Sequence, residues 1–145
     1  MESMKIKPQD VLNELQISEI RKKNDFRNIF ALLFDWGLMV FGLYIFYFYP
    51  SPLTFMLSVI IIGSRQFALA VLAHDGAHNL LFSNLRVNDF ISQWFCAYPI
   101  FQDNRVYRPY HLKHHRFTET DDDPDLTLSA PFPISKKSFM RKVAR

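Results

Sequence analysis

The 145-residue sequence has one cysteine, four glycines and no recognisable leader segment. The single cysteine, Cys96, excludes an internal disulfide and leaves the redox compartment open, and we expect it to pack as a small apolar residue. The first 25 residues contain neither an apolar run nor a small-residue cleavage site, so no secretory signal peptide is expected. The net charge of +3 is too small and too dispersed to indicate nucleic-acid binding.

Almost half of the residues are apolar, and many of them lie in two long runs. The runs cover residues 29–49 and 53–73, separated by Pro50-Ser51-Pro52. Each has about the 20 residues that a helix needs to cross a bilayer core. We therefore predict an all-α integral membrane protein built on a transmembrane helical hairpin. The alternative is a pair of core helices in a soluble protein, which fits a tight uncharged turn between two runs of this length less well.

Lysine and arginine are distributed unevenly around these runs. The turn has none, six precede the first run, ten follow the second, and Arg65 lies inside the second. By the positive-inside rule, both ends of the hairpin are expected on the cytoplasmic side and the turn on the opposite side. Residues 1–27 then form a polar cytoplasmic segment that includes a short amphipathic stretch on the membrane surface.

Two charged residues, Asp35 and Arg65, interrupt the apolar runs. Asp35 lies 15 residues before Pro50, and Arg65 lies 13 residues after Pro52. At about 1.5 Å per residue, the two charges reach nearly the same depth in an antiparallel hairpin. An unpaired charge at that depth costs several kcal/mol, so we predict that both face the protein interior and form an ion pair, directly or through Gln66. The alternative is that one or both extend to the cytoplasmic interface.

A third apolar stretch, residues 89–101, is 13 residues long and contains Pro99. It is too short to span a bilayer, so we expect it to lie in the interface or to form a re-entrant segment. No further apolar span follows, and residues 126–145 are expected to form a surface segment.

All five histidines fall into two clusters, HDGAH at 74–78 and HLKHH at 111–115. On a helix, the spacings i, i+4 and i, i+3, i+4 place the rings on one face, where they can point at a common centre. Neutral imidazole is a preferred ligand of iron, zinc and copper. We predict that the second run continues as a helix through the first cluster, so that both clusters lie at the cytoplasmic end of the hairpin. The candidate metal ligands are His74, His78, His111, His114 and His115.

The second cluster suggests two metal ions. His111 and His115 can share one ion, whereas His114, about 100° round the helix, points toward another. Imidazole ligands with few thiolates suit oxygen chemistry better than structural zinc. The first cluster also resembles the HExxH zinc-protease pattern, with Asp75 in place of the glutamate, but a zinc protease would not need the second cluster.

Two neighbouring features bear on these clusters. The missing side chain of Gly76 would let another helix or a substrate come close. The acidic run at residues 121–125 is expected to be a solvated loop, or to supply a carboxylate that hydrogen-bonds the distal nitrogen of a ligating histidine.

The first cluster, followed about thirty residues later by YRPYHLKHHRF and then DPD, resembles the first two histidine boxes of the membrane-bound fatty acid desaturase superfamily. That superfamily also contains hydroxylases and ketolases. The resemblance implies two non-haem iron ions, O2 as co-substrate, a lipid or acyl-chain substrate, and an electron donor such as a ferredoxin or a b-type cytochrome. It also implies that the five histidines are iron ligands, and that Asp75 and Asp125 lie beside these ligands without binding iron.

One departure from the family pattern concerns a third box, another HxxHH that follows two further spans in the family. No histidine follows His115, so residues 28–145 are expected to be the N-terminal part of a desaturase domain whose C-terminal part is absent. Five imidazoles cannot fill two iron coordination spheres, and we expect the chain alone to be inactive. Three interpretations stay open: a lipid desaturase, a carotenoid or alkyl hydroxylase or ketolase, and a non-catalytic membrane metal-binding fragment.

Overall fold

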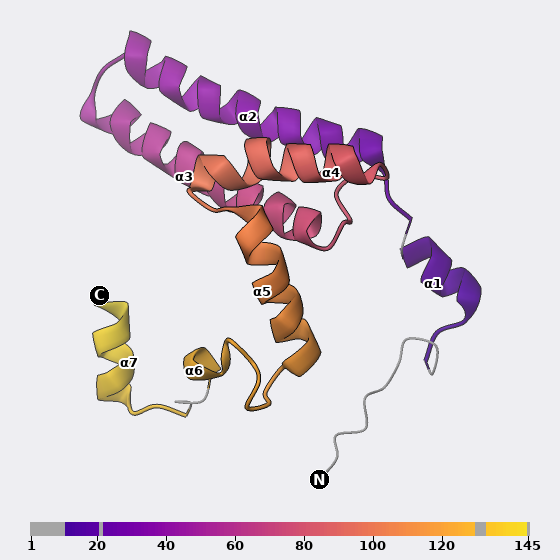
Figure 1. Cartoon of the computed structure of the whole chain (residues 1–145). Helices are drawn as coiled ribbons and strands as arrows, with labels where there is room; N and C mark the ends of the chain where they lie inside the picture. The colour runs from indigo at the N-terminus through magenta and orange to yellow at the C-terminus, as the bar shows by residue number, and fades with distance from the viewer. Residues whose placement is uncertain (1–10, 21, 130–132, 145) are drawn as a thin grey trace. The chain divides into compact units, whose positions relative to one another are not determined.

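A computed structural model describes residues 11–20, 22–129 and 133–144, and these residues form helices and connecting turns without any strand (Figure 1). The predicted all-α class is therefore confirmed. The chain divides into two compact units, residues 1–104 and 105–145. The first unit begins, within the described residues, with the short helix α1 (Glu14–Ile20).

The first unit is built on a helical hairpin of α2 (Asp25–Phe48) and α3 (Pro52–Ala77), which lie side by side in Figure 1. Both helices are long and apolar enough to cross a membrane. α2 begins one turn before its predicted span, and α3 continues about one turn past residue 73, into the first histidine cluster, as predicted. Side-chain caps fix the two starts: Asn24 accepts a hydrogen bond from the Arg27 N–H, and Ser51 forms a capping box with Thr54.

The two long helices approach closely near the turn. Ser58 Oγ donates a hydrogen bond of 2.7 Å to the Gly42 carbonyl, across the hairpin. A Cβ atom on Gly42 would lie 3.4 Å from side-chain atoms of Ile61 and Ile62, so the glycine permits this contact.

The charges inside the hairpin form the ion pair that the sequence predicts. Arg65 Nη1 lies 2.9 Å from Asp35 Oδ1, and the Asp35 and Arg65 side chains are 7% and 27% exposed. The Arg65 guanidinium also lies 6.0 Å from the centre of the Phe34 ring, near the limit of a cation–π contact. Because Asp35 is buried, it does not extend to the interface.

The predicted segment 89–101 is part of a longer helical stretch that comprises α4 (Leu85–Ile91), η2 (Ser92–Ala97) and η3 (Tyr98–Ile100). The predicted start at residue 89 is too late. The helix begins at Leu85 because the Asn84 side chain caps it, accepting hydrogen bonds from two backbone N–H groups. Cys96 is fully buried in η2, as expected.

This stretch runs alongside the hairpin (Figure 1). Just before α4, the Ser83 N–H donates to Asp25 Oδ1 at 2.8 Å, and further on Trp36 Nε1 donates to the Phe95 carbonyl at 3.0 Å. Asp25 and Trp36 are eleven residues apart on α2, a distance of about 16 Å along the helix axis. The stretch follows the axis of the hairpin over this length.

Buried amide side chains close the end of α3. Asn88 Nδ2 donates to the Gly76 carbonyl at 2.9 Å, and Asn104 Nδ2 donates to the Ala73 carbonyl at 3.2 Å. Asn88 is fully buried and Asn104 is 4% exposed. Gly76 is among the last four residues of α3, whose carbonyls lack partners within the helix, whereas Ala73 lies just before them. Together the two amides hold the turn that carries the first histidine cluster.

Gly76 lies against η2, as the sequence suggested for a neighbouring helix. A Cβ atom on Gly76 would lie 2.2 Å from Ser92 Cβ and 2.8 Å from Ser92 Oγ. We expect Gly76→Ala to destabilise the fold by about 1–3 kcal/mol, because neither helix can move away without opening a buried contact. The measurement is the thermal unfolding midpoint of the chain in detergent micelles, followed by circular dichroism.

Gly63→Ala on the same helix is the matched control, because a Cβ atom there would meet nothing within 4 Å. It should stabilise the helix by roughly 0.5–1 kcal/mol. Adding Ser92→Gly to Gly76→Ala should restore part of the loss. Equal midpoints for the two alanine variants would show that the Gly76–Ser92 contact does not constrain the fold.

Candidate metal centre

The first histidine cluster lies at the end of α3. His74 is in the last turn, whereas His78 is the residue that caps the helix, so the predicted helix ends one residue before its second histidine. The two rings are nevertheless in contact, edge to face, with centroids 4.7 Å apart and an interplanar angle of 60°. His74 Nδ1 lies 3.5 Å from Asp75 Oδ1, at the outer limit of a hydrogen bond, and both side chains are roughly half exposed.

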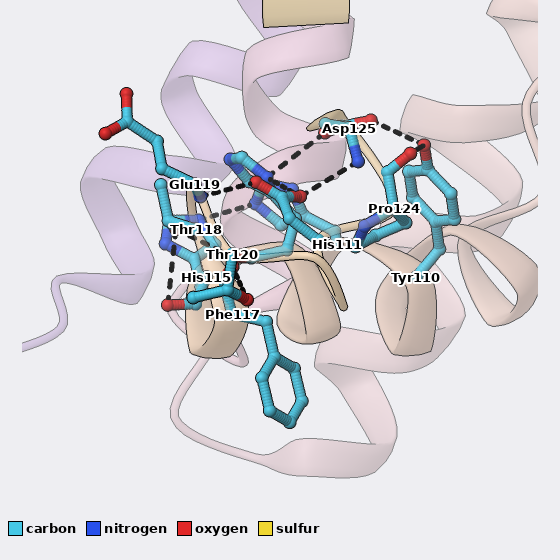
Figure 2. Close-up of polar contacts among 11 residues, drawn as sticks. Tyr110, His111, His115, Phe117, Thr118, Glu119, Thr120, Pro124 and Asp125 are labelled. Carbon is cyan, nitrogen blue, oxygen red and sulfur yellow. Dashed lines mark hydrogen bonds and ion pairs between the residues drawn. The ribbon is translucent and has the colours of Figure 1, made fainter. Parts of the chain in front are cut away.

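The second cluster lies on α5 (Asn104–Phe117). His111 Nε2 and His115 Nε2 are 3.0 Å apart, and Figure 2 shows the two rings close together. Two imidazole nitrogens that bind one ion at about 2.1 Å and at a right angle would also be about 3 Å apart. The separation is that of a hydrogen bond between the rings and also that of adjacent ligands on one metal ion, so the residues fit that role.

Tyr107 supports the first histidine of this cluster. Its ring stacks on His111, with centroids 4.8 Å apart and an interplanar angle of 14°. The stacking restricts rotation of the imidazole. The sequence reasoning missed this role of Tyr107, although the i, i+4 spacing on a predicted helix pointed to a contact.

His114 is held by the acidic run that follows α5. His114 Nδ1 donates a hydrogen bond of 2.8 Å to Asp123 Oδ1 and lies 3.4 Å from Asp125 Oδ2. The hydrogen bond to Asp123 raises the pKa of His114 above its ordinary value, against a smaller opposing effect of burial. An ionised carboxylate only accepts hydrogen bonds, so Asp123 places the proton on Nδ1 and leaves Nε2 of His114 as the nitrogen that could bind a metal ion.

Asp123 is itself buried and well supported. It is 6% exposed and accepts hydrogen bonds of 2.8 Å from the backbone N–H groups of Glu119 and Asp125. Burial would raise the pKa of Asp123, but the hydrogen bonds from His114 and the backbone outweigh it, and the pKa lies below its ordinary value. The solvated-loop interpretation of the acidic run is therefore wrong for Asp123, though Asp121 and Asp122 are exposed.

Asp125, the residue that the resemblance placed beside the ligands, has another principal partner. It accepts a hydrogen bond from the Tyr110 hydroxyl, which Figure 2 shows. Its contact with His114 is longer than that of Asp123. Donor atoms of His114, Asp123 and Asp125 lie within 4.8 Å of one another, so this group could also chelate an ion. We favour hydrogen bonding, because Asp123 Oδ1 already contacts His114 Nδ1 at 2.8 Å.

The two clusters belong to different units of the chain, the first to residues 1–104 and the second to residues 105–145. Within each unit, the structure brings together the rings that the sequence grouped: His74 with His78, and His111 with His115. His114 is turned toward the acidic run.

Comparisons with known proteins agree with this chemistry. The family model for fatty acid desaturases matches residues 50–145, which include both clusters. The chain is also similar to dihydrorhizobitoxine desaturase of Bradyrhizobium elkanii, with 40% identity over 72 residues. That match covers 48% of this chain and 20% of the relative, so the chain spans about a fifth of the relative's length. No solved structure matches significantly. The chain therefore belongs to the fatty acid desaturase family.

Proposed function

We propose that this chain carries the first two histidine boxes of an O2-dependent lipid desaturase, which introduces a double bond into a fatty acyl chain. The observation that carries the proposal is the 3.0 Å separation of His111 Nε2 and His115 Nε2 on one helix of a desaturase-family chain. Adjacent imidazoles at ligand spacing, with few thiolates nearby, favour iron used for oxygen chemistry over structural zinc.

In this proposal, two iron ions are held by His74, His78, His111, His114 and His115. Bound iron would activate O2, the oxidant. With two electrons from a ferredoxin or a b-type cytochrome and two protons, O2 would take two hydrogens from the acyl chain and be reduced to two molecules of water. The chain's own residues hold the ligands in place. Asp123 fixes the proton of His114 on Nδ1, and Tyr107 restricts the His111 ring.

The hairpin of α2 and α3 is proposed to span the membrane, with both histidine clusters on the cytoplasmic side. The distribution of lysine and arginine supports this orientation, since the turn between the helices has neither residue. An acyl chain could then approach from the lipid phase, away from water, while the electron donor stays at the aqueous face.

The deciding experiment measures iron bound to the purified chain in detergent, together with acyl products formed in membranes that contain the longest natural form of the protein. We expect bound iron, and unsaturated products that need O2. Hydroxylated or keto products would favour the hydroxylase or ketolase alternative, and absence of iron would favour a non-catalytic fragment. Five imidazoles leave positions open on two six-coordinate ions, so desaturation by the 145-residue chain alone would contradict the proposed ligand count.

Asp123 provides a sharper test of the ligand assignment. Asp123→Asn removes the charged acceptor that orients His114, and loss of such an outer contact typically weakens metal binding by about 10–100-fold. Titration of the metal-free chain with Fe(II) under argon measures the affinity. Asp122→Asn is the matched control, because Asp122 is exposed and adjacent in sequence, and it should leave the affinity unchanged. Equal affinities for the two variants would show that Asp123 does not contribute to metal binding.

A further inference from the structure

A cavity of about 410 Å³ lies in the first unit, where the segment before α2 meets the end of α3. Its polar lining includes three basic residues, Lys22, Lys23 and Arg27, and one carboxylate, Asp75. Its apolar lining consists of Ala31 and Leu72 on the two helices and Leu80 in the loop after α3. Neither the metal centre nor the ion pair between α2 and α3 uses the three basic residues.

The lining changes from charged to apolar along the helix axes. Ala31 follows Arg27 by one turn of α2, and Leu72 precedes Asp75 by about one turn of α3. Because α2 and α3 are antiparallel, both steps lead in the same direction, toward the apolar middle of the hairpin. The cavity therefore has a basic end at the ends of the helices and an apolar end toward the middle of the hairpin. An amphiphile in a bilayer has the same order, with its polar headgroup outside and its acyl chains inside.

The basic end is supported by the loop that follows α3. Asn28 Nδ2 donates a 2.6 Å hydrogen bond to the Leu81 carbonyl, and Lys23 Nζ donates a longer one of 3.4 Å to the Phe82 carbonyl. These contacts hold the first turn of α2 in place before any ligand arrives. A preorganised wall lowers the cost of ordering on binding.

Charge decides between the ligands that such a cavity would accept. Three cations and one carboxylate leave a net charge of two positive units at the cavity. Arginine and lysine form strong charge-assisted hydrogen bonds with phosphate oxygens. A zwitterionic headgroup carries an ammonium group besides its phosphate, and that positive charge would be repelled by these cations. An anionic headgroup has no such group.

We propose that this cavity binds the headgroup phosphate of an anionic phospholipid, with the start of an acyl chain against Ala31 and Leu72. The proposal rests on the membrane insertion of α2 and α3 but not on iron. A simpler account is that basic residues at a membrane interface attract anionic lipids wherever they lie. Arg86 distinguishes the two accounts, because it is exposed on α4, at the same end of the hairpin, and does not line the cavity.

The experiment uses the iron-free full chain in detergent, incubated with equal amounts of phosphatidylglycerol and phosphatidylcholine that carry identical acyl chains. Native mass spectrometry counts the lipids retained. We expect one phosphatidylglycerol per chain, preferred over phosphatidylcholine by at least about tenfold, which is the contribution of one charge-assisted hydrogen bond. The double variant Lys23→Gln/Arg27→Gln should lose this preference, and Arg86→Gln should keep it.

Three results would overturn the proposal: equal retention of the two lipids, an equal loss for Arg86→Gln, or full displacement of phosphatidylglycerol by millimolar inorganic phosphate. The last result would assign the site to free phosphate. Because no iron is present, failure here leaves the metal centre untouched. Conversely, if the chain retains phosphatidylglycerol but binds no iron, the lipid site is supported and the proposed desaturase function is contradicted.

Discussion

Replacing His115 with alanine is expected to reduce the Fe(II) affinity of the chain by more than the roughly 100-fold that loss of an outer contact can cost. The reason is the 3.0 Å separation of His111 Nε2 and His115 Nε2, which places both nitrogens at the spacing of adjacent ligands. In the proposed centre, removing one of them would break one metal–nitrogen bond and leave His111 as the remaining ligand of this pair. Titration of the metal-free variant under argon measures the affinity, and the same change in the longest natural form of the protein should abolish O2-dependent unsaturation.

Lys113→Ala is the matched control, since Lys113 lies on the same helix between the histidines and cannot bind metal while charged. It should retain the affinity of the unaltered chain. Circular dichroism should show the same helix content for both variants. If His115→Ala binds iron as tightly as Lys113→Ala does, the second histidine cluster is not a ligand set and the proposed function fails.

The ion pair inside the hairpin should give the largest effect on stability. Arg65→Leu leaves the Asp35 carboxylate buried without its 2.9 Å partner, and breaking a buried pair in this way typically costs about 3–5 kcal/mol. The free energy of unfolding in mixed micelles, measured as the fraction of denaturing detergent increases, gives the effect. The loss should be smaller for Arg65→Lys, which keeps the charge but not the fork of the guanidinium.

The double variant Asp35→Leu/Arg65→Leu separates the two causes of instability. Removing both charges restores an apolar interior, and replacement of a whole buried pair by apolar residues is often neutral or stabilising. We therefore expect the double variant to be more stable than Arg65→Leu alone. A double variant as unstable as the single one would show that lost packing of the arginine stem, and not an unpaired carboxylate, causes the effect.

The hairpin was predictable because its sequence signals are strong and local. Two runs of about 20 apolar residues, broken at Pro50 and Pro52, leave few alternatives, and the equal depth of Asp35 and Arg65 follows from helix geometry. The helix ends were less predictable, since Asn24 and Asn84 act through capping bonds and not through hydropathy. The course of residues 85–100 depended on contacts such as Trp36 with Phe95, which are distant in sequence.

The part of the candidate site that was predictable is the part that depends only on the spacing of residues along a helix. The contact between His111 and His115 was predicted from their spacing, because residues four apart lie on the same face of a helix. The partner of His114 was not predictable, because Asp121, Asp122 and Asp123 look alike in sequence. Only the fold of the turn after α5 shows which carboxylate is buried.

The amides that close α3 couple the first histidine cluster to a distant part of the chain. Asn88 and Asn104 reach α3 from the stretch that runs alongside the hairpin and from the start of α5. A local opening that lifts Asn88 away would also release the turn that holds His74, so the proposed metal binding would depend on that stretch staying folded. By thermodynamic linkage, an ion bound at His74 and His78 would in turn suppress such openings.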